Sequence, residues 1–201
     1  MTKIVMGLAA AALLAAVPAG AQLGGGRLAV EVSGGAAIPA QTFGARNGAD
    51  TGAGFGANLV YAFAPAFRGY LGYEREYLPC DNSRCGSGGY VSEGASVGAE
   101  LALVRAGRPL GAYPWVRAGV LLNTLDHEVP DGSATTSVGS QRSVGFQVRA
   151  GVGVPVTRRV TLLPGLGYSM YRADFDGAEG AVADEMNVGI VDAGVTLRLA
   201  L

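Results

Sequence analysis

The sequence predicts an all-β fold, an eight-stranded antiparallel up-and-down transmembrane β-barrel, behind a cleaved export signal. Two observations predict the barrel: apolar and polar residues alternate with a period of two over most of the chain, and the connections between the alternating segments are long and short in turn. A short apolar segment near the N-terminus predicts the export signal. The length of 201 residues suits a single domain.

The N-terminal segment has the three parts of a secretory signal peptide. Lys3 supplies a positive charge, an apolar run of 14 residues follows from Ile4 to Val17, and small residues precede Gln22. The run is shorter than the ~20 residues that a membrane-spanning helix needs, which disfavours the alternative of a retained helical anchor. We therefore predict a signal peptide over residues 1–21, with cleavage after Ala21, and a barrel domain over residues 22–201.

Eight segments have the composition and alternation of β-strands. In Val144–Val154, for example, valine and phenylalanine alternate with glycine, glutamine and arginine, as expected of a strand whose faces meet different surroundings. The alternation fails near Val188–Asp192, where we predict a bulge or a change of register. The predicted strands are Arg27–Ile38, Gly54–Phe63, Phe67–Tyr77, Tyr90–Val104, Ala112–Asn123, Val144–Val154, Val160–Tyr171 and Asn187–Leu201.

The lengths of the connections indicate a membrane barrel. The long connections are residues 39–53, 78–89, 124–143 and 172–186, and the short ones are 64–66, 105–111 and 155–159. With an even number of strands, this order places every long loop at one end, as in outer-membrane barrels with short periplasmic turns and long outer loops. A hydrophobic fraction of 49% and a mean hydropathy of +0.30, without a long apolar block, also fit strands that face lipid.

The net charge gives no reason to expect a nucleic-acid partner. Apart from Lys3, every basic residue is an arginine, so the mature chain has about two more acidic than basic groups.

Several segments resemble one known family. Tyr113–Gly119, Phe146–Val154 and Gly194–Leu201, together with the signal peptide and the eight strands, resemble the small outer-membrane protein β-barrel family, which includes opacity-type and other eight-stranded porin-like proteins. The resemblance covers Arg27 to Leu201. It implies a location in the bacterial outer membrane, with contacts to outer-membrane lipid, insertion by the barrel assembly machinery and a surface partner that the sequence does not identify.

The sequence gives no reason to expect catalysis, a cofactor or a metal. His127 is the single histidine, and we expect it to be solvated in a long loop rather than to act as a catalytic base. Zinc-protease and phosphate-loop patterns are absent from the sequence, and we predict no enzymatic activity and no cofactor. The acidic stretch Asp174–Glu179 lacks the full calcium-loop pattern, and we predict no metal site there.

The two cysteines are close together in one predicted outer loop. Cys80 and Cys85 are five positions apart, and neighbouring cysteines usually pair in an oxidising compartment. A metal site would need more cysteine or histidine ligands. We therefore predict a Cys80–Cys85 disulfide.

The strand faces predicted to point inward carry charged residues. An eight-stranded barrel is just wide enough for side chains, so these charges must pair. Glu100 and Arg117 face each other if the hairpin between their strands is regular, and Glu31 and Arg198 lie near the same end, with Arg149 nearby. We predict that they plug the periplasmic half of the lumen; the alternative is a gated ion path. The predicted lumen residues are Glu31, Arg68, Glu74, Glu100, Arg117, Arg149 and Arg198, with Glu76 as a further acid.

Two functional interpretations remain in competition. The favoured one is an integral outer-membrane barrel with a structural or surface-interaction role and at most a small, largely plugged pore. The alternative is a soluble secreted barrel of the lipocalin type that binds a small apolar ligand. They differ in which face is apolar, and the first predicts that Leu101, Val148, Val152, Val195 and Leu197 point outward.

Overall fold

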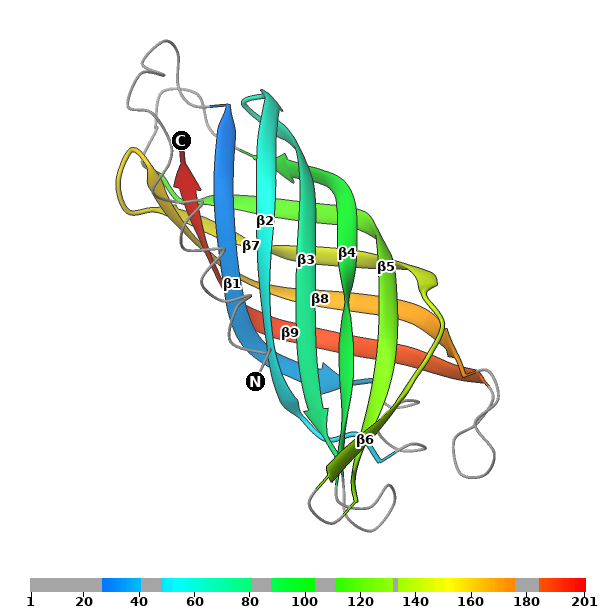
Figure 1. The fold of residues 1–201 in the computed structure, drawn as a ribbon. Helices are drawn as coiled ribbons and strands as arrows, with labels where there is room; N and C mark the ends of the chain where they lie inside the picture. Colours follow the sequence, from blue (N-terminus) through cyan, green and yellow to red (C-terminus); the bar gives the residue numbers. More distant parts are fainter. Residues whose placement is uncertain (1–26, 41–47, 81–87, 104–110, 132–133, 176–184) are drawn as a thin grey trace.

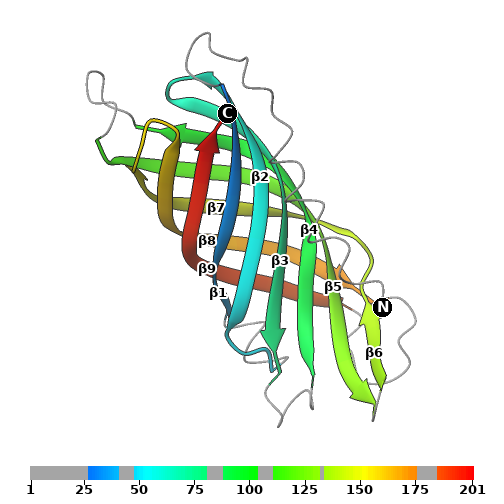
Figure 2. The same cartoon turned by 60° about the vertical axis from the view of Figure 1, so that its left-hand side comes forward.

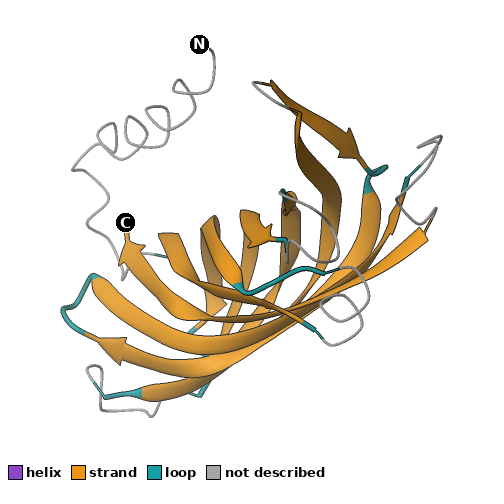
Figure 3. Ribbon diagram, turned by 90° about the horizontal axis from the view of Figure 1, so that it is seen from below, coloured by secondary structure: helices purple, strands orange, loops and turns teal. Residues whose placement is uncertain are grey.

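The protein was analysed as a computed structural model, which describes six stretches of the chain. No helix in these stretches is long and apolar enough to cross a membrane, a finding that does not bear on strands. All the regular structure in them is β-strand (Figure 3). The described residues are 27–40, 48–80, 88–103, 111–131, 134–175 and 185–201.

Eight of the nine described strands form a closed antiparallel barrel (Figures 1 and 2). Each strand pairs with the next barrel strand along the chain, and pairing of the first strand, β1, with the last, β9, closes the barrel. The barrel strands are β1 (Leu28–Pro39), β2 (Gly52–Ala64), β3 (Phe67–Pro79), β4 (Gly89–Ala102), β5 (Tyr113–Asp131), β7 (Ser143–Pro155), β8 (Val160–Asp174) and β9 (Glu185–Ala200). The predicted fold class is confirmed, and each of the eight predicted segments coincides with one barrel strand to within a few residues at its ends, except at the long extension of β5.

The prediction of a loop over residues 124–143 was wrong in part, because this segment contains a ninth strand. β5 continues to Asp131, and β6 (Ala134–Gly139) pairs with its last residues, from Asp126 to Asp131. This hairpin lies at the end of the barrel opposite the C-terminus (Figure 1). The extension is possible because β4 also pairs with β5 as far as Glu128, so the backbone of β5 keeps hydrogen-bond partners beyond the predicted strand end.

The predicted bulge near Val188–Asp192 was also wrong. The register of β9 is continuous against β8 through all these residues, and against β1 from Ile190 to Asp192. The alternation fails there because Val188 and Ile190 are apolar although they point inward, and both are fully buried. The irregularity occurs instead between β2 and β3, where the register shifts between Ala62 and Ala64.

The barrel carries its large apolar side chains on the outside. The five residues predicted to point outward, Leu101, Val148, Val152, Val195 and Leu197, are between 45% and 51% exposed. The inward positions between them on β7 and β9 are half-buried and are Arg149, Gly151 and Thr196. The face exposed to the surroundings therefore suits lipid and not water.

Candidate functional site

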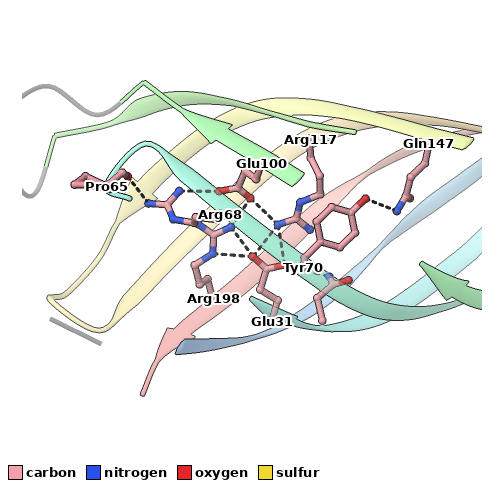
Figure 4. A network of polar contacts seen from close by, with 9 residues as sticks. Glu31, Pro65, Arg68, Tyr70, Glu100, Arg117, Gln147 and Arg198 are labelled. Atoms are coloured by element: carbon pink, nitrogen blue, oxygen red, sulfur yellow. Dashed lines mark hydrogen bonds and ion pairs between the residues drawn. The ribbon is translucent and has the colours of Figure 1, made fainter. Parts of the chain in front are cut away.

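Five charged side chains meet inside the barrel, in the half of the lumen nearer the short β2–β3 turn (Figure 4). We call this group, Glu31, Arg68, Glu100, Arg117 and Arg198, the ionic layer. Arg117 Nη2 lies 3.0 Å from Glu31 Oε1 and 2.6 Å from Glu100 Oε2. Arg198 Nη2 lies 2.5 Å from Glu100 Oε2, and its Nε lies 2.7 Å from Glu31 Oε1. Arg68 Nη1 lies 2.7 Å from Glu100 Oε1.

Strand register brings the ionic layer together. Glu100 on β4 lies opposite Arg68 on β3 and Arg117 on β5, and Glu31 on β1 lies opposite Arg198 on β9. Two further ion pairs, Arg117 with Glu31 and Arg198 with Glu100, join strands that are not neighbours in the sheet. Those contacts cross the lumen, so the layer closes it and also ties opposite walls together.

Aromatic rings hold the Arg117 guanidinium in place. Its Cζ lies 4.5 Å from the centre of the Tyr70 ring and 5.7 Å from that of Trp115, positions that permit cation–π attraction. The Tyr70 hydroxyl accepts a hydrogen bond of 2.9 Å from Gln147 Nε2 across the lumen. Gly119 leaves room for this hydroxyl, because a Cβ there would collide with it.

Four of the five side chains of the ionic layer are almost fully removed from solvent, and the fifth, Arg68, is 16% exposed. The Glu31 and Glu100 side chains are 0% exposed, while those of Arg117 and Arg198 are 5% and 7% exposed. Asn58 Nδ2 adds a hydrogen bond of 3.1 Å to Glu31 Oε2. Buried charges are tolerated only when they are paired and hydrogen-bonded, so each member of the layer depends on its partners.

A second charged group lies nearer the middle of the lumen. We call Glu74, Glu76, Arg149 and Asp192 the middle cluster. Arg149 Nη2 donates to Glu74 Oε2 at 2.7 Å and to Asp192 Oδ1 at 3.2 Å. Glu76 is also buried, at 5% exposed. The middle cluster contains three acids and one arginine, whereas the ionic layer contains two acids and three arginines.

The middle cluster differs from what the sequence predicted. Arg149 was expected beside the Glu100–Arg117 pair; it lies opposite Arg117 in register, but its ion pairs are with Glu74 and Asp192. Asp192 was missed because a bulge was predicted there. The signal was available, since Asp192 is an even number of residues from Arg198 and therefore points to the same face of an unbroken strand.

The opposite half of the lumen, toward the β5–β6 hairpin, is filled by apolar side chains. Its members come from six of the eight barrel strands and the adjoining residues, and none is more than 5% exposed. We call this group the apolar cap: Ala37, Ala49, Leu78, Tyr90, Leu121, Leu125, Tyr171, Ala173, Phe175, Met186, Val188 and Ile190.

His127 lies against the apolar cap and is not a solvated loop residue as predicted. It belongs to the extended part of β5, is 8% exposed, and stacks on Tyr90 with ring centres 4.7 Å apart. Its Nε2 lies 3.9 Å from Cys80 Sγ. Burial lowers the pKa of His127 below its ordinary value, which favours the neutral imidazole. The ring therefore contributes to the packing of the extended part of β5 against β4.

Two predicted features lie partly outside the described residues. Cys85 is not one of the described residues, so the Cys80–Cys85 disulfide stays a prediction. Most of the acidic stretch that begins at Asp174 is also outside them, although its flanks carry an exposed ion pair between Arg172 and Glu185. The described part of the chain holds no group of three or more histidine, cysteine or acidic side chains arranged to bind a metal ion.

Aromatic side chains cluster on the outside of the barrel near the short β2–β3 turn. The ring centres of Tyr61 and Phe63 are 5.0 Å apart and those of Phe63 and Phe67 are 5.7 Å apart. All three rings are exposed, at 40%, 60% and 42%. Exposed aromatics near strand ends are typical of the level at which a membrane barrel meets lipid headgroups.

Comparisons with known proteins identify the fold. No protein-family model and no curated protein sequence matches the chain. Solved structures do match. Neisserial surface protein A is 18% identical, with 89% of this chain and 100% of that chain covered and a TM-score of 0.65. Outer membrane protein OprG from Pseudomonas aeruginosa is 13% identical, with 89% and 99% covered and a TM-score of 0.55.

A third similar structure is Ail, the attachment invasion locus protein of Yersinia pestis. It is 11% identical, with 88% of this chain and 100% of that chain covered and a TM-score of 0.50. These proteins are small eight-stranded outer-membrane β-barrels, so the predicted resemblance to that class of fold is confirmed.

Proposed function

We propose that this chain, which has the fold of the small eight-stranded outer-membrane β-barrels, is an integral protein of the bacterial outer membrane with a closed lumen and a structural or surface-interaction role. The observation that carries the proposal is the inversion of its faces: large apolar side chains are exposed outside while charged side chains are buried inside. A lipocalin-like barrel requires the opposite arrangement, with an apolar interior around its ligand and a polar exterior. Neither the residues of the lumen nor those of the outer wall therefore support the alternative of a soluble, lipocalin-like barrel.

The orientation in the membrane follows from the connections. The turns at 65–66 and 156–159 are short and lie at the same end of the barrel as the β4–β5 connection, 103–112, whereas the β5–β6 hairpin and the connections 40–51, 80–88 and 175–184 lie at the opposite end. In outer-membrane barrels the short turns face the periplasm. The ionic layer then lies toward the periplasm and the apolar cap toward the cell exterior. Residues exposed at the outer end would make the contacts with surface partners.

Export and assembly complete the proposal. A signal peptide over residues 1–21 would direct the chain to the periplasm, and the barrel assembly machinery would insert residues 22–201 beside outer-membrane lipid. A Cys80–Cys85 disulfide would then form in the oxidising compartment. Nothing among the described residues calls for an enzymatic step, a cofactor or a nucleic-acid partner.

The proposal is tested by fractionation and by face-specific labelling. The folded protein should be found in the outer-membrane fraction and should migrate differently on gels before and after boiling. With Cys80 and Cys85 replaced by serine, a cysteine at position 148 should react with a lipid-phase probe, while one at position 149 should not. Recovery of the protein as a soluble periplasmic species, or the reverse labelling pattern, would contradict a membrane barrel with this orientation.

A further inference from the structure

Three arginines lie at the end of the barrel that carries the short turns. Arg27 directly precedes β1, and Arg158 and Arg159 belong to the turn between β7 and β8. The start of β1, both short turns and the C-terminus lie together at this end (Figure 2). We call Arg27, Arg158 and Arg159 the basic rim.

Backbone hydrogen bonds place the basic rim on one side of the barrel. The carbonyl oxygen of Arg159 accepts a hydrogen bond of 2.8 Å from Ala200 N on β9, and that of Arg27 accepts one of 2.7 Å from Ala62 N on β2. Because β9 lies between β1 and β8, the rim extends over three neighbouring strands. Two strand spacings amount to roughly 10 Å, a distance that two long arginine side chains can bridge toward one ligand.

The three guanidinium groups are exposed and have no ion-pair partner among the described residues. The described acidic side chains at this end are those of Glu31 and Glu100, which are 0% exposed and are bound by the arginines of the ionic layer. The main-chain carboxylate of Leu201 also lies at this end, but it balances at most one of three positive charges. The basic rim is therefore a surface of unpaired positive charge.

The opposite end of the barrel has the reverse balance of charge. Its described acidic residues are Asp50, Glu93, Asp126, Glu128, Asp131, Asp174 and Glu185, and its described arginines are Arg75, Arg142 and Arg172. Arg75 and Arg172 are already paired, with Glu93 and Glu185. An anionic partner is therefore attracted to the basic rim and repelled from the other end.

Aromatic side chains mark the depth of the basic rim in the membrane. Tyr61, whose exposed ring packs near Phe63, is the register partner of Leu28, the residue that follows Arg27. Exposed aromatics of membrane barrels lie at the level of the lipid headgroups. The guanidinium groups beside them are therefore at the depth where lipid phosphates occur.

We propose that the basic rim binds the phosphate group of an anionic phospholipid, of the phosphatidylglycerol type, in the periplasmic leaflet of the outer membrane. The inference rests on the proposed function, because the orientation of the barrel assigns this end to the periplasm. Guanidinium groups form paired hydrogen bonds with phosphate oxygens, and every basic residue after Lys3 is an arginine. A zwitterionic lipid presents the same phosphate together with its own ammonium group, which the arginines repel. The rim therefore selects a lipid with net negative charge.

Native mass spectrometry of the protein released from nonionic detergent micelles measures this preference. Phosphatidylglycerol should bind more tightly than phosphatidylcholine, and each arginine that contacts the headgroup should contribute about fivefold in affinity. A higher concentration of ammonium acetate in the micelle solution should reduce the difference between the two lipids, because salt screens exposed charges.

Two double variants remove equal charge from opposite ends of the barrel. Arg158→Gln/Arg159→Gln should lower the affinity for phosphatidylglycerol by up to roughly 25-fold and leave that for phosphatidylcholine nearly unchanged. Arg142→Gln/Arg172→Gln, with the same loss of charge at the outer end, should preserve the preference. The difference in gel migration before and after boiling verifies folding. If the first double variant does not fold, its two single variants decide the question, with a loss of about fivefold expected for each.

The outcomes separate this inference from the proposed function. Equal affinity of the unmodified protein for the two lipids would overturn the lipid site, while heat-modifiable migration would still support the barrel. A preference that is lost only in Arg142→Gln/Arg172→Gln would overturn it in favour of a site at the outer end. Displacement of phosphatidylglycerol by an equal concentration of inorganic phosphate would show a site for the free ion and not for a lipid. Absence of heat-modifiable migration in the unmodified protein would contradict the barrel and the lipid site together.

Discussion

The ionic layer and the apolar cap close the same narrow lumen by different physical means. The ionic layer uses two carboxylates and three guanidinium groups from β1, β3, β4, β5 and β9, and its contacts require particular partners at particular distances. The apolar cap relies on burial, which has no direction and tolerates a change of shape. The loss of one charged partner leaves its neighbours charged and buried, whereas the loss of one methyl group leaves a small void. We therefore expect the two ends of the lumen to respond very differently to similar substitutions.

The largest effect is expected for Glu100→Gln. Glu100 contacts Arg68, Arg117 and Arg198, so neutralising it leaves three guanidinium groups around one remaining carboxylate. The free energy of unfolding should fall by about 3–5 kcal/mol, as measured by urea denaturation in micelles. Glu31→Gln is the control within the layer and should cost less, because Glu31 has two arginine partners and not three. A loss below about 1 kcal/mol for Glu100→Gln would contradict a buried, mutually dependent layer.

The next effect is the coupling between Glu100 and Arg117. Residues within one network of ion pairs show coupling free energies of roughly 0.5–3 kcal/mol, and we expect about 2 kcal/mol here. The double variant Glu100→Gln/Arg117→Gln should therefore lose less stability than the sum of the two single losses. The same urea measurement on the four proteins of the cycle provides the value. Additive losses would show that the 2.6 Å contact between these residues contributes no pairwise stability.

A smaller effect is expected in the apolar cap. Ile190 is fully buried, and Ile190→Val removes one methylene group without leaving a charge or a polar atom unpaired. The expected loss is about 0.5–1.5 kcal/mol in the urea experiment. A loss as large as that of Glu100→Gln would mean that the cap is as sensitive to its exact composition as the ionic layer, and would remove the distinction between the two.

The smallest effect is expected for an ion pair outside the lumen. Arg172 and Glu185 pair across the outer ends of β8 and β9, with side chains 59% and 56% exposed. Arg172→Gln should change the free energy of unfolding by less than about 1 kcal/mol, because water solvates both groups when the pair is lost. Addition of salt should weaken even that difference. A cost comparable to that of Glu100→Gln would show that exposure does not govern the strength of ion pairs in this barrel.

The periodicity of the sequence was sufficient to predict most of the barrel and part of the ionic layer. Alternation identifies the faces of each strand, and a regular hairpin predicts which residues of β4 and β5 lie opposite each other. For that reason Glu100 and Arg117 could be placed together before the structure was known. Glu31 and Arg198 could be placed at the same end because Glu31 lies near the start of β1 and Arg198 near the end of β9, and these antiparallel strands close the barrel.

The remaining features depend on contacts that alternation does not encode. The inward face of β9 changes from charged at Arg198 to apolar at Ile190, so a rule that expects polar inward residues fails there and hides Asp192. His127 is buried because β5 continues past its predicted end and meets Tyr90 from β4. The partners of Arg149 could not be predicted either, since Glu74 on β3 reaches it across the lumen from a strand that does not neighbour β7.

The closed lumen is tested most directly by single-channel recording in planar bilayers. We expect no steady unitary current from the unmodified protein. We also expect none from Arg117→Ala, because the apolar cap remains when a guanidinium group of the ionic layer is removed. A steady unitary current from the unmodified protein would contradict the closed lumen, and a current that appears only in Arg117→Ala would show that the ionic layer is the sole barrier.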